Sequence, residues 1–336
     1  MDEGWRTRLG HVPIRGVNMK EKVQVRSPIN IALCKYWGKK DEDNVLAYTD
    51  SISLTLDSFY TDVVIEKKKD GKLEFYLNDV LLTGDEREKM IKYMRAIEQD
   101  IEHMPIRISS KNTGPTAAGL ASSSSAFSAL SLALLTFFEK IYSFDELVEL
   151  SRLGSGSACR SLLDGFVRWK KDGQIEKLVS APKDLRVIVV LFSKKQKKIS
   201  SREAMKIGVE TSPYYDEYVK KNQVISNEMA PALKTFDFDK IGLLMEQSTA
   251  LMHKVMETSS PKVSYPTKDS YRVMNLVNVY RGKGVTAYST MDAGPNVKIF
   301  TKEKDVDFLM EALKREGYSS LEVLKPGGKA RVIANE

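Results

Sequence analysis

The feature that most constrains the fold is a run of small residues that leads directly into an apolar helix. Residues 112–142 read NTGPTAAGLASSSSAFSALSLALLTFFEKIY, with Pro, Gly, Ala and Ser in the first half and Leu, Ala and Phe in the second. A helix over the second half is apolar on nearly every face, which predicts that it is buried. The fold therefore has to enclose this helix within a core.

The small residues before the helix indicate one of two roles. Gly and Ala let the backbone come close to a ligand, and the free amides and the dipole of a helix start favour an anion such as phosphate. Small residues also permit tight helix packing, and the segment alone does not choose between these roles. It has no GxxxxGK[ST] pattern, which excludes a Walker-type phosphate loop.

Patterns on either side of the helix predict an α+β fold. Residues 20–82 and 105–112 have strand patterns with turns between them, and residues 86–103 place apolar side chains at helical spacing. After the apolar strand LRVIVVLF, helical patterns run through residues 203–282. A hairpin at 285–301, a helix at DVDFLMEALKREGY and a final strand pair around PGGKARVI follow.

With 336 residues and 42% hydrophobic content, the chain is long enough for two domains. We predict an N-terminal domain at 19–185, which includes the small-residue loop, and a C-terminal domain at 186–336. Residues 1–18 are predicted to be an extension outside the fold, or else a flexible arm. They lack the apolar stretch of a secretory signal, and no run approaches the roughly 20 residues of a membrane span.

Charge and cysteine content narrow the function classes. Cys34 and Cys159 occur without a CxxC or Cys/His cluster, which predicts neither disulfides nor structural zinc and suits a cytoplasmic protein. The net charge of +7 would suit a nucleic-acid-binding protein. However, the lysines lie in mixed runs such as EKKKDGK, and the same excess suits an enzyme with a polyanionic small substrate. We predict no nucleic-acid and no membrane partner.

Five segments, in order along the chain, resemble the signature segments of mevalonate diphosphate decarboxylases, a branch of the GHMP kinase superfamily. They are SPINIALCKYWGKKDE, NTGPTAAGLASSSSA, RLGSGSACRS, KKISSREAMK and STMDAGPNVKIF, and the resemblance covers about residues 22–310. A Gly/Ser loop alone would imply any GHMP kinase, whereas KYWGK, GSACRS and MDAGPN together indicate the decarboxylase branch.

The resemblance implies a two-domain GHMP kinase fold. Its N-terminal domain would be like ribosomal protein S5, its C-terminal domain would be a ferredoxin-like α/β sandwich, and a cleft would separate them. The implied reaction uses ATP and Mg²⁺ to phosphorylate the 3-hydroxyl of mevalonate 5-diphosphate. Phosphate and carbon dioxide then leave to give isopentenyl diphosphate. A homodimer is also implied, although no segment indicates an interface.

The resemblance also assigns roles to individual residues. Asp292 would orient the hydroxyl and receive its proton, and Lys35 would stabilise that carboxylate and offset phosphoryl charge. Arg160 would hold the substrate carboxylate, for which a planar guanidinium is suited, and Ser201 belongs to the same catalytic set. Without the resemblance, Asp292 reads as an Asx turn beside a Gly-Pro bend, and Arg160 as one partner of a surface ion pair.

Binding residues are implied in the same way. Tyr36, Lys39, Ser155 and Ser157 would bind substrate together with Arg160. The nucleotide would contact Pro115, Ala118, Gly119, Leu120, Ala121, Ser122, Ser123 and Ser124. Ser122 is the predicted Mg²⁺ ligand, although four serines stand in a row and the pattern does not separate them.

Two departures from the family pattern bear on the substrate. Thr49 and Asp50 stand where a small polar pair is common, and Leu163, Asp164 and Gly165 stand where the family has an aromatic-Gly-Gly segment. Asp50 would weaken diphosphate binding unless it points away or pairs with a lysine. A relative that only phosphorylates, such as a mevalonate 3-kinase, or one that decarboxylates the monophosphate, therefore stays an alternative.

Overall fold

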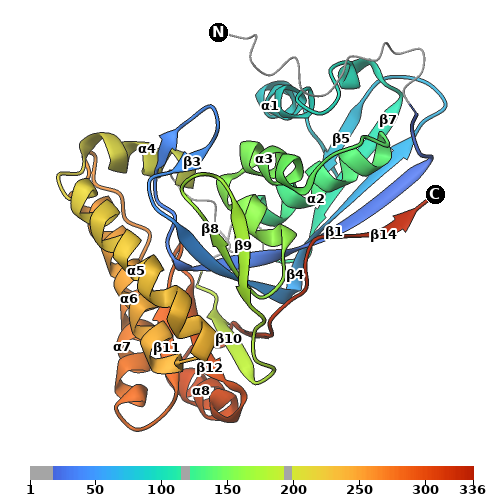
Figure 1. Ribbon diagram of the computed structural model, residues 1–336. Coiled ribbons are helices and arrows are strands. Elements are labelled where there is room, and N and C mark those ends of the chain that lie inside the picture. The colour runs from blue at the N-terminus through green and yellow to red at the C-terminus, as the bar shows by residue number, and fades with distance from the viewer. Residues whose placement is uncertain (1–17, 115–121, 193–198) are drawn as a thin grey trace.

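The computed structural model describes residues 18–114, 122–192 and 199–336. Within these residues the chain forms two halves, one around a sheet of eight strands and one around a sheet of four (Figure 1). None of the helices in these ranges is long and apolar enough to cross a membrane.

The first sheet has the order β14-β1-β4-β7-β5-β6, with β8 and β9 attached beside β4. Its strands are β1 (Lys22–Cys34), β4 (Ser51–Lys67), β5 (Glu74–Leu77), β6 (Val80–Leu81), β7 (Ile106–Asn112), β8 (Phe166–Trp169), β9 (Ile175–Val179) and β14 (Arg331–Asn335). Neighbouring strands run antiparallel except β5 and β7, which are parallel. A short hairpin of β2 (Lys39–Asp41) and β3 (Leu46–Ala47) stands apart from this sheet.

The apolar helix α2 (Ser122–Phe137) packs on β1 and β4 (Figure 1). Ala129, Leu134 and Phe137 are fully buried, as its composition predicted. The helix α3 (Phe144–Gly154) follows and begins with a capping box between Ser143 and Glu146. The helix predicted at 86–103 is shorter than expected: α1 (Gly84–Met94) ends early, and a single 3₁₀ turn, η1 (Ile101–His103), follows.

The second sheet has the order β11-β12-β10-β13 and is antiparallel throughout. Its strands are β10 (Leu185–Val190), β11 (Ala287–Thr290), β12 (Val297–Lys302) and β13 (Leu321–Leu324). The helices of this half are α4 (Ser201–Thr211), α5 (Tyr215–Thr235), α6 (Phe238–Thr258), α7 (Lys268–Arg281) and α8 (Glu303–Arg315). The predicted hairpin at 285–301 is confirmed as β11 and β12, and its loop carries Asp292.

The predicted pairing of the last two strands is wrong. β13 pairs with β10 in the second sheet, whereas β14 pairs with β1 in the first. The connection crosses between the sheets where Gly327 lies against the backbone of Leu56, so close that a Cβ at position 327 would be 2.4 Å from the Leu56 carbonyl carbon. The chain therefore returns to its first sheet at the end.

A shared apolar core joins the two halves. Ile31 and Leu33 of β1 belong to the same buried cluster as Val187 of β10, Met229 of α5 and Met245 of α6. Burial of each such side chain contributes about 1.5–3 kcal/mol, so this contact is strongly favoured. It places the end of β1, where the KYWGK segment begins, against the helices of the second half.

Candidate active site

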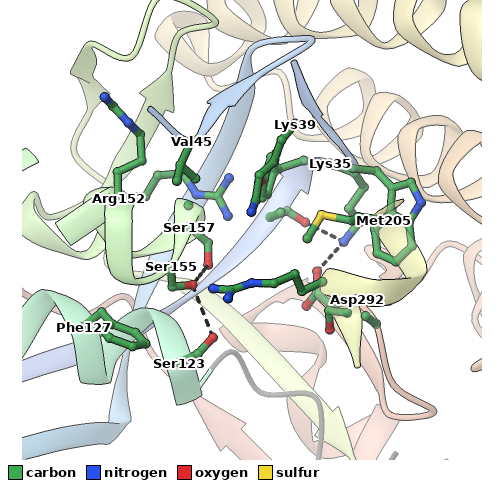
Figure 2. A pocket seen from close by; sticks show the side chains of 18 of the residues that line it. Lys35, Lys39, Val45, Ser123, Phe127, Arg152, Ser155, Ser157, Met205 and Asp292 are labelled. Carbon is green, nitrogen blue, oxygen red and sulfur yellow. Dashed lines mark hydrogen bonds and ion pairs between the residues drawn. The ribbon is translucent and has the colours of Figure 1, made fainter. Parts of the chain in front are cut away.

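A pocket lies where the two halves meet, and Figure 2 shows most of the side chains that line it. They come from β1 and the segment after it, from α2, from α3 and the 3₁₀ helix η2 (Gly156–Leu162) that follows it, from α4, from α6 and from the β11–β12 loop. The sequence-predicted residues that the pocket brings together are Lys35, Tyr36, Lys39, Ser123, Ser155, Ser157, Arg160, Ser201 and Asp292.

The carboxylate of Asp292 lies between two buried ammonium groups. Lys35 Nζ donates to Oδ1 at 2.8 Å, and Lys298 Nζ lies 3.0 Å from Oδ2. Burial by itself would raise the pKa of Asp292, but the charges of Lys298 and Lys35 outweigh it and hold that pKa well below its usual range. Asp292 is therefore an anion at neutral pH, and its side chain keeps 21% exposure toward the pocket.

Lys35 is almost completely buried, and its Nζ also donates to the carbonyl of Ala32 at 2.8 Å. Burial lowers the pKa of Lys35, while the charge of Asp292 opposes that shift. The partner Lys298 was missed by the sequence reasoning. The available signal was a lysine inside the apolar strand VKIF, where its neighbours Val297 and Ile299 are fully buried.

Arg160 is 3% exposed and is held by neutral partners. Nη1 donates to Ser51 Oγ at 2.6 Å, and Nε and Nη2 donate to Asn30 Oδ1 at 3.3 and 3.2 Å. The surface-ion-pair reading is therefore wrong. Because no hydrogen bond of this guanidinium in the described part of the chain goes to a carboxylate, its charge is available to an anion in the pocket.

Three serine hydroxyls lie in a row on one wall of the pocket (Figure 2). Ser155 Oγ lies 3.4 Å from Ser123 Oγ and 3.4 Å from Ser157 Oγ. Ser123 is exposed in the first turn of α2, whereas Ser124 is fully buried and does not line the pocket. The side chain of Ser122 and the predicted nucleotide contacts Pro115, Ala118, Gly119, Leu120 and Ala121 lie outside the described residues.

The remaining predicted residues close the other walls. Tyr36 packs edge-on against Trp169 with ring centroids 4.7 Å apart, and its buried hydroxyl has no hydrogen-bond partner among the described residues. Lys39 Nζ is 2.6 Å from Glu42 Oε2. Ser201 is the first residue of α4. Basic and amide side chains that the sequence reasoning missed also line the pocket, namely Asn30, Arg152 and Arg202.

The unusual Asp50 does not face the pocket. It is 5% exposed, and its Oδ2 accepts from Arg168 Nε at 2.8 Å while Oδ1 accepts from the amide of Lys171 at 2.9 Å. Asp50 thus points away from the pocket and pairs with an arginine, whereas the sequence analysis considered a lysine as its partner. Asp164 pairs with Lys177 at 2.7 Å near the surface. Neither carboxylate lines the pocket.

No group of three or more His, Cys, Asp or Glu side chains that would hold a metal is found in residues 18–114, 122–192 and 199–336. The pocket instead offers the hydroxyl of Ser123 at the start of α2, beside those of Ser155 and Ser157. This donor set suits Mg²⁺, which keeps several waters and leans on nucleotide phosphates rather than on a protein cage.

Two family models cover most of the chain. The diphosphomevalonate decarboxylase-like N-terminal domain matches residues 27–180, and the mevalonate 5-diphosphate decarboxylase C-terminal domain matches residues 187–323. The diphosphomevalonate decarboxylase of Ganoderma lucidum is 33% identical over 322 residues, which are 85% of this chain and 80% of that protein. The human diphosphomevalonate decarboxylase is 33% identical over 321 residues, 84% of this chain and 78% of that protein.

Solved structures are similar over nearly the whole chain. The mevalonate diphosphate decarboxylase of Staphylococcus aureus has a TM-score of 0.86 at 34% identity and covers 94% of this chain and 99% of its own. That of Enterococcus faecalis has a TM-score of 0.84 at 33% identity, with 94% and 99% covered. A further structure, MDDEF in complex with MVAPP, AMPPCP and magnesium, has a TM-score of 0.85 at 33% identity, again with 94% and 99% covered. The expected two-domain fold is confirmed by these matches.

Proposed function

The chain belongs to the diphosphomevalonate decarboxylase family, and we propose that it converts mevalonate 5-diphosphate to isopentenyl diphosphate with ATP. The reaction phosphorylates the 3-hydroxyl and releases ADP, phosphate and carbon dioxide. Related structures support this substrate pair, since one is a complex with MVAPP, AMPPCP and magnesium. The proposal includes a cytoplasmic location and a homodimer as further expectations.

One observation carries the proposal: an anionic Asp292, fixed by Lys35 and Lys298, shares a pocket with the buried Arg160, whose hydrogen-bond partners in the described residues are neutral. A small-molecule kinase needs a group that orients the attacking alcohol. A decarboxylase that acts on a hydroxy acid also needs a cation that holds the carboxylate. Both groups are in this pocket.

Asp292 is proposed to act first as an acceptor for the 3-hydroxyl hydrogen. Its lowered pKa makes it a weak base for a free alcohol, so proton transfer before attack is disfavoured. In a loose phosphoryl-transfer transition state the oxygen needs little prior activation, and its proton becomes acidic only as the new P–O bond forms. The proton then passes to Asp292, and Lys35 and Lys298 compensate the carboxylate charge until that point.

Arg160 is proposed to hold the substrate carboxylate while the 3-phosphate leaves. Loss of phosphate leaves an electron-deficient carbon at C3, and the C–C bond electrons of the departing carboxylate form the double bond. Carbon dioxide leaves as the neutral product of that step. Arg160 thereby fixes the orientation of the carboxylate, and with it the C–C bond that breaks, until the carboxylate loses its charge as carbon dioxide.

ATP and Mg²⁺ serve as the co-substrate and the metal ion of this reaction. When bound, Mg²⁺ offsets charge on the phosphoryl oxygens. The hydroxyl of Ser123 at the start of α2, together with the predicted loop before it, is proposed to contact the nucleotide phosphates. Ser155, Ser157, Tyr36, Lys39 and Ser201 are proposed to bind the acid substrate and its diphosphate.

A substrate panel tests the proposal. Mevalonate 5-diphosphate, the monophosphate and free mevalonate are each incubated with ATP and Mg²⁺, and ADP, phosphate and carbon dioxide are measured in parallel. The proposal predicts the highest kcat/KM for the diphosphate and equal amounts of all three products. ADP with a stable phosphorylated acid would indicate a 3-kinase, and a preference for the monophosphate would indicate the other relative.

A further inference from the structure

A buried polar cluster from the second half of the chain holds the main chain of Lys35. Lys35 N donates to Ser248 Oγ at 2.8 Å, and Lys35 O accepts from Asn222 Nδ2 at 2.9 Å and from Tyr218 Oη at 3.0 Å. Ser248 donates in turn to Asn222 Oδ1 at 2.6 Å, and Asn222 Nδ2 also donates to Thr49 Oγ1 at 3.0 Å. We call Asn222, Ser248 and Tyr218 the Lys35 clamp.

The clamp replaces the sheet bonds that Lys35 lacks. β1 ends at Cys34, whose partner on β4 is Ile52, so Lys35 is the first residue past the β1–β4 ladder. A buried amide and carbonyl cost free energy if they have no partner. Asn222, Ser248 and Tyr218 are each 0% exposed, and they supply those partners from helices α5 and α6.

Through this arrangement the second half of the chain fixes both ends of the Lys35–Asp292 contact. The main chain of Lys35 is fixed by α5 and α6, while its Nζ meets Asp292 on the β11–β12 loop. Thr49, one of the residues that departs from the family pattern, is part of the same network. We propose that Asn222 is a positioning residue that acts on the reaction through Lys35, an inference that rests on the proposed function.

Asn222 is the hub because it serves both sides of the clamp. Its amide nitrogen donates to Lys35 and Thr49, and its amide oxygen accepts from Ser248. The next residue on α5 belongs to a different network: Gln223 accepts from the amide of Asp50, away from the pocket. Gln223 is therefore a matched control on the same helix.

A double-mutant cycle tests the inference. kcat is measured at saturating ATP and mevalonate 5-diphosphate for the parent, Asn222→Ala, Lys35→Met and the double variant, and thermal unfolding is followed for each. Misplacement of a charged group by even about 1 Å can cost up to about a hundredfold in rate, so we expect Asn222→Ala to lower kcat about tenfold or more. In the Lys35→Met background the same substitution should lower kcat less than about twofold. Gln223→Ala should leave the parent kcat within about twofold.

The outcomes separate this inference from the proposed function. An equal loss from Asn222→Ala in both backgrounds would overturn the inference and leave the function standing. Normal turnover by Lys35→Met would instead overturn the role assigned to Lys35, and the positioning role with it. Should Asn222→Ala not fold, Ser248→Ala carries the same test, since it removes the acceptor of the Lys35 amide and must show the same dependence on Lys35.

Discussion

Replacement of Asp292 by asparagine should separate the catalytic role proposed for this residue from its structural one. The side chain keeps its shape, but the anion between Lys35 and Lys298 is lost. Removal of a general base typically costs about 10²–10⁴ in rate, so kcat for Asp292→Asn should fall about a thousandfold. The KM for ATP should change less than about threefold, because the nucleotide is expected on the α2 side of the pocket.

The same substitution should destabilise the fold by a predictable amount. Lys298 is 0% exposed and Lys35 is 1% exposed, and each has an ion pair with Asp292, so loss of the carboxylate charge leaves two buried cations less well compensated. At an effective dielectric constant of about 20, a charge pair about 3 Å apart is worth about 5 kcal/mol before desolvation. Loss of one partner of a buried pair costs about 3–5 kcal/mol, which corresponds to roughly 6–10 °C in Tm at about 2 °C per kcal/mol.

Addition of Lys298→Met to Asp292→Asn tests this reasoning. The second change removes one of the two buried cations beside position 292, so it should restore roughly half of the lost Tm without restoring activity. Asp164→Asn is the control, because Asp164 pairs with Lys177 at an exposed site and should cost less than about 1 kcal/mol. Calorimetry and steady-state kinetics give both quantities. A double variant no more stable than Asp292→Asn, or an Asp292→Asn enzyme within tenfold of the parent kcat, would refute the account.

Three further substitutions have defined outcomes. Arg160→Gln should raise the KM for mevalonate 5-diphosphate or lower kcat by about tenfold or more, while the KM for ATP stays unchanged. If neither the KM for mevalonate 5-diphosphate nor kcat changes, Arg160 does not hold the substrate carboxylate. Burial, together with the charge of Lys35, lowers the pKa of His253 to about 4. Between pH 6.5 and 4, His253 is therefore protonated in the unfolded chain but neutral in the folded one. As the pH is lowered through this range, the free energy of unfolding should fall by up to about 3 kcal/mol. His253→Gln should reduce this pH-dependent loss of stability, as measured by urea unfolding at several pH values. An equally steep loss in the variant would contradict the role given to His253. Asp50→Asn should leave the KM for the diphosphate within about twofold because Asp50 pairs with Arg168, whereas a clear drop in KM would show that Asp50 repels the substrate.

Local patterns in the sequence predicted the elements that depend on local physics. The start of α3 follows from a capping box between Ser143 and Glu146, whose Ser-x-x-Glu pattern is local in the sequence. The hairpin that holds Asp292 was predictable from two apolar runs around a Gly-Pro turn. The burial of α2 followed from a surface that is apolar nearly all round.

Long-range pairing was not predictable in this way. β14 pairs with β1 across about 300 residues of sequence, and an adjacent strand such as β13 looks like an equally good partner. The second cation on Asp292 was missed for a related reason. The strand of Lys298 is buried on both faces, so its sequence marks a buried lysine but not the group that this lysine meets, and the ion pair with Asp292 appears only once the sheet is assembled.

The resemblance supplied site residues that single positions could not. Arg160 reads as an ordinary arginine until η2 places it against Asn30 and Ser51 in the interior. Whether Asp50 weakens diphosphate binding depends on the orientation of its side chain, and its hydrogen bond with Arg168 holds that side chain away from the pocket. Which polar groups face a cavity is set by packing between elements, and the sequence holds that information only indirectly.

The roles proposed for Asp292 and Arg160 can be checked in a crystal structure with mevalonate 5-diphosphate and a non-hydrolysable ATP analogue. If Asp292 orients the alcohol, one of its carboxylate oxygens should lie within about 2.6–3.2 Å of the 3-hydroxyl. The guanidinium of Arg160 should contact the substrate carboxylate in the same complex. A complex in which Asp292 contacts neither the acid substrate nor the transferring phosphoryl group would contradict the role proposed for Asp292.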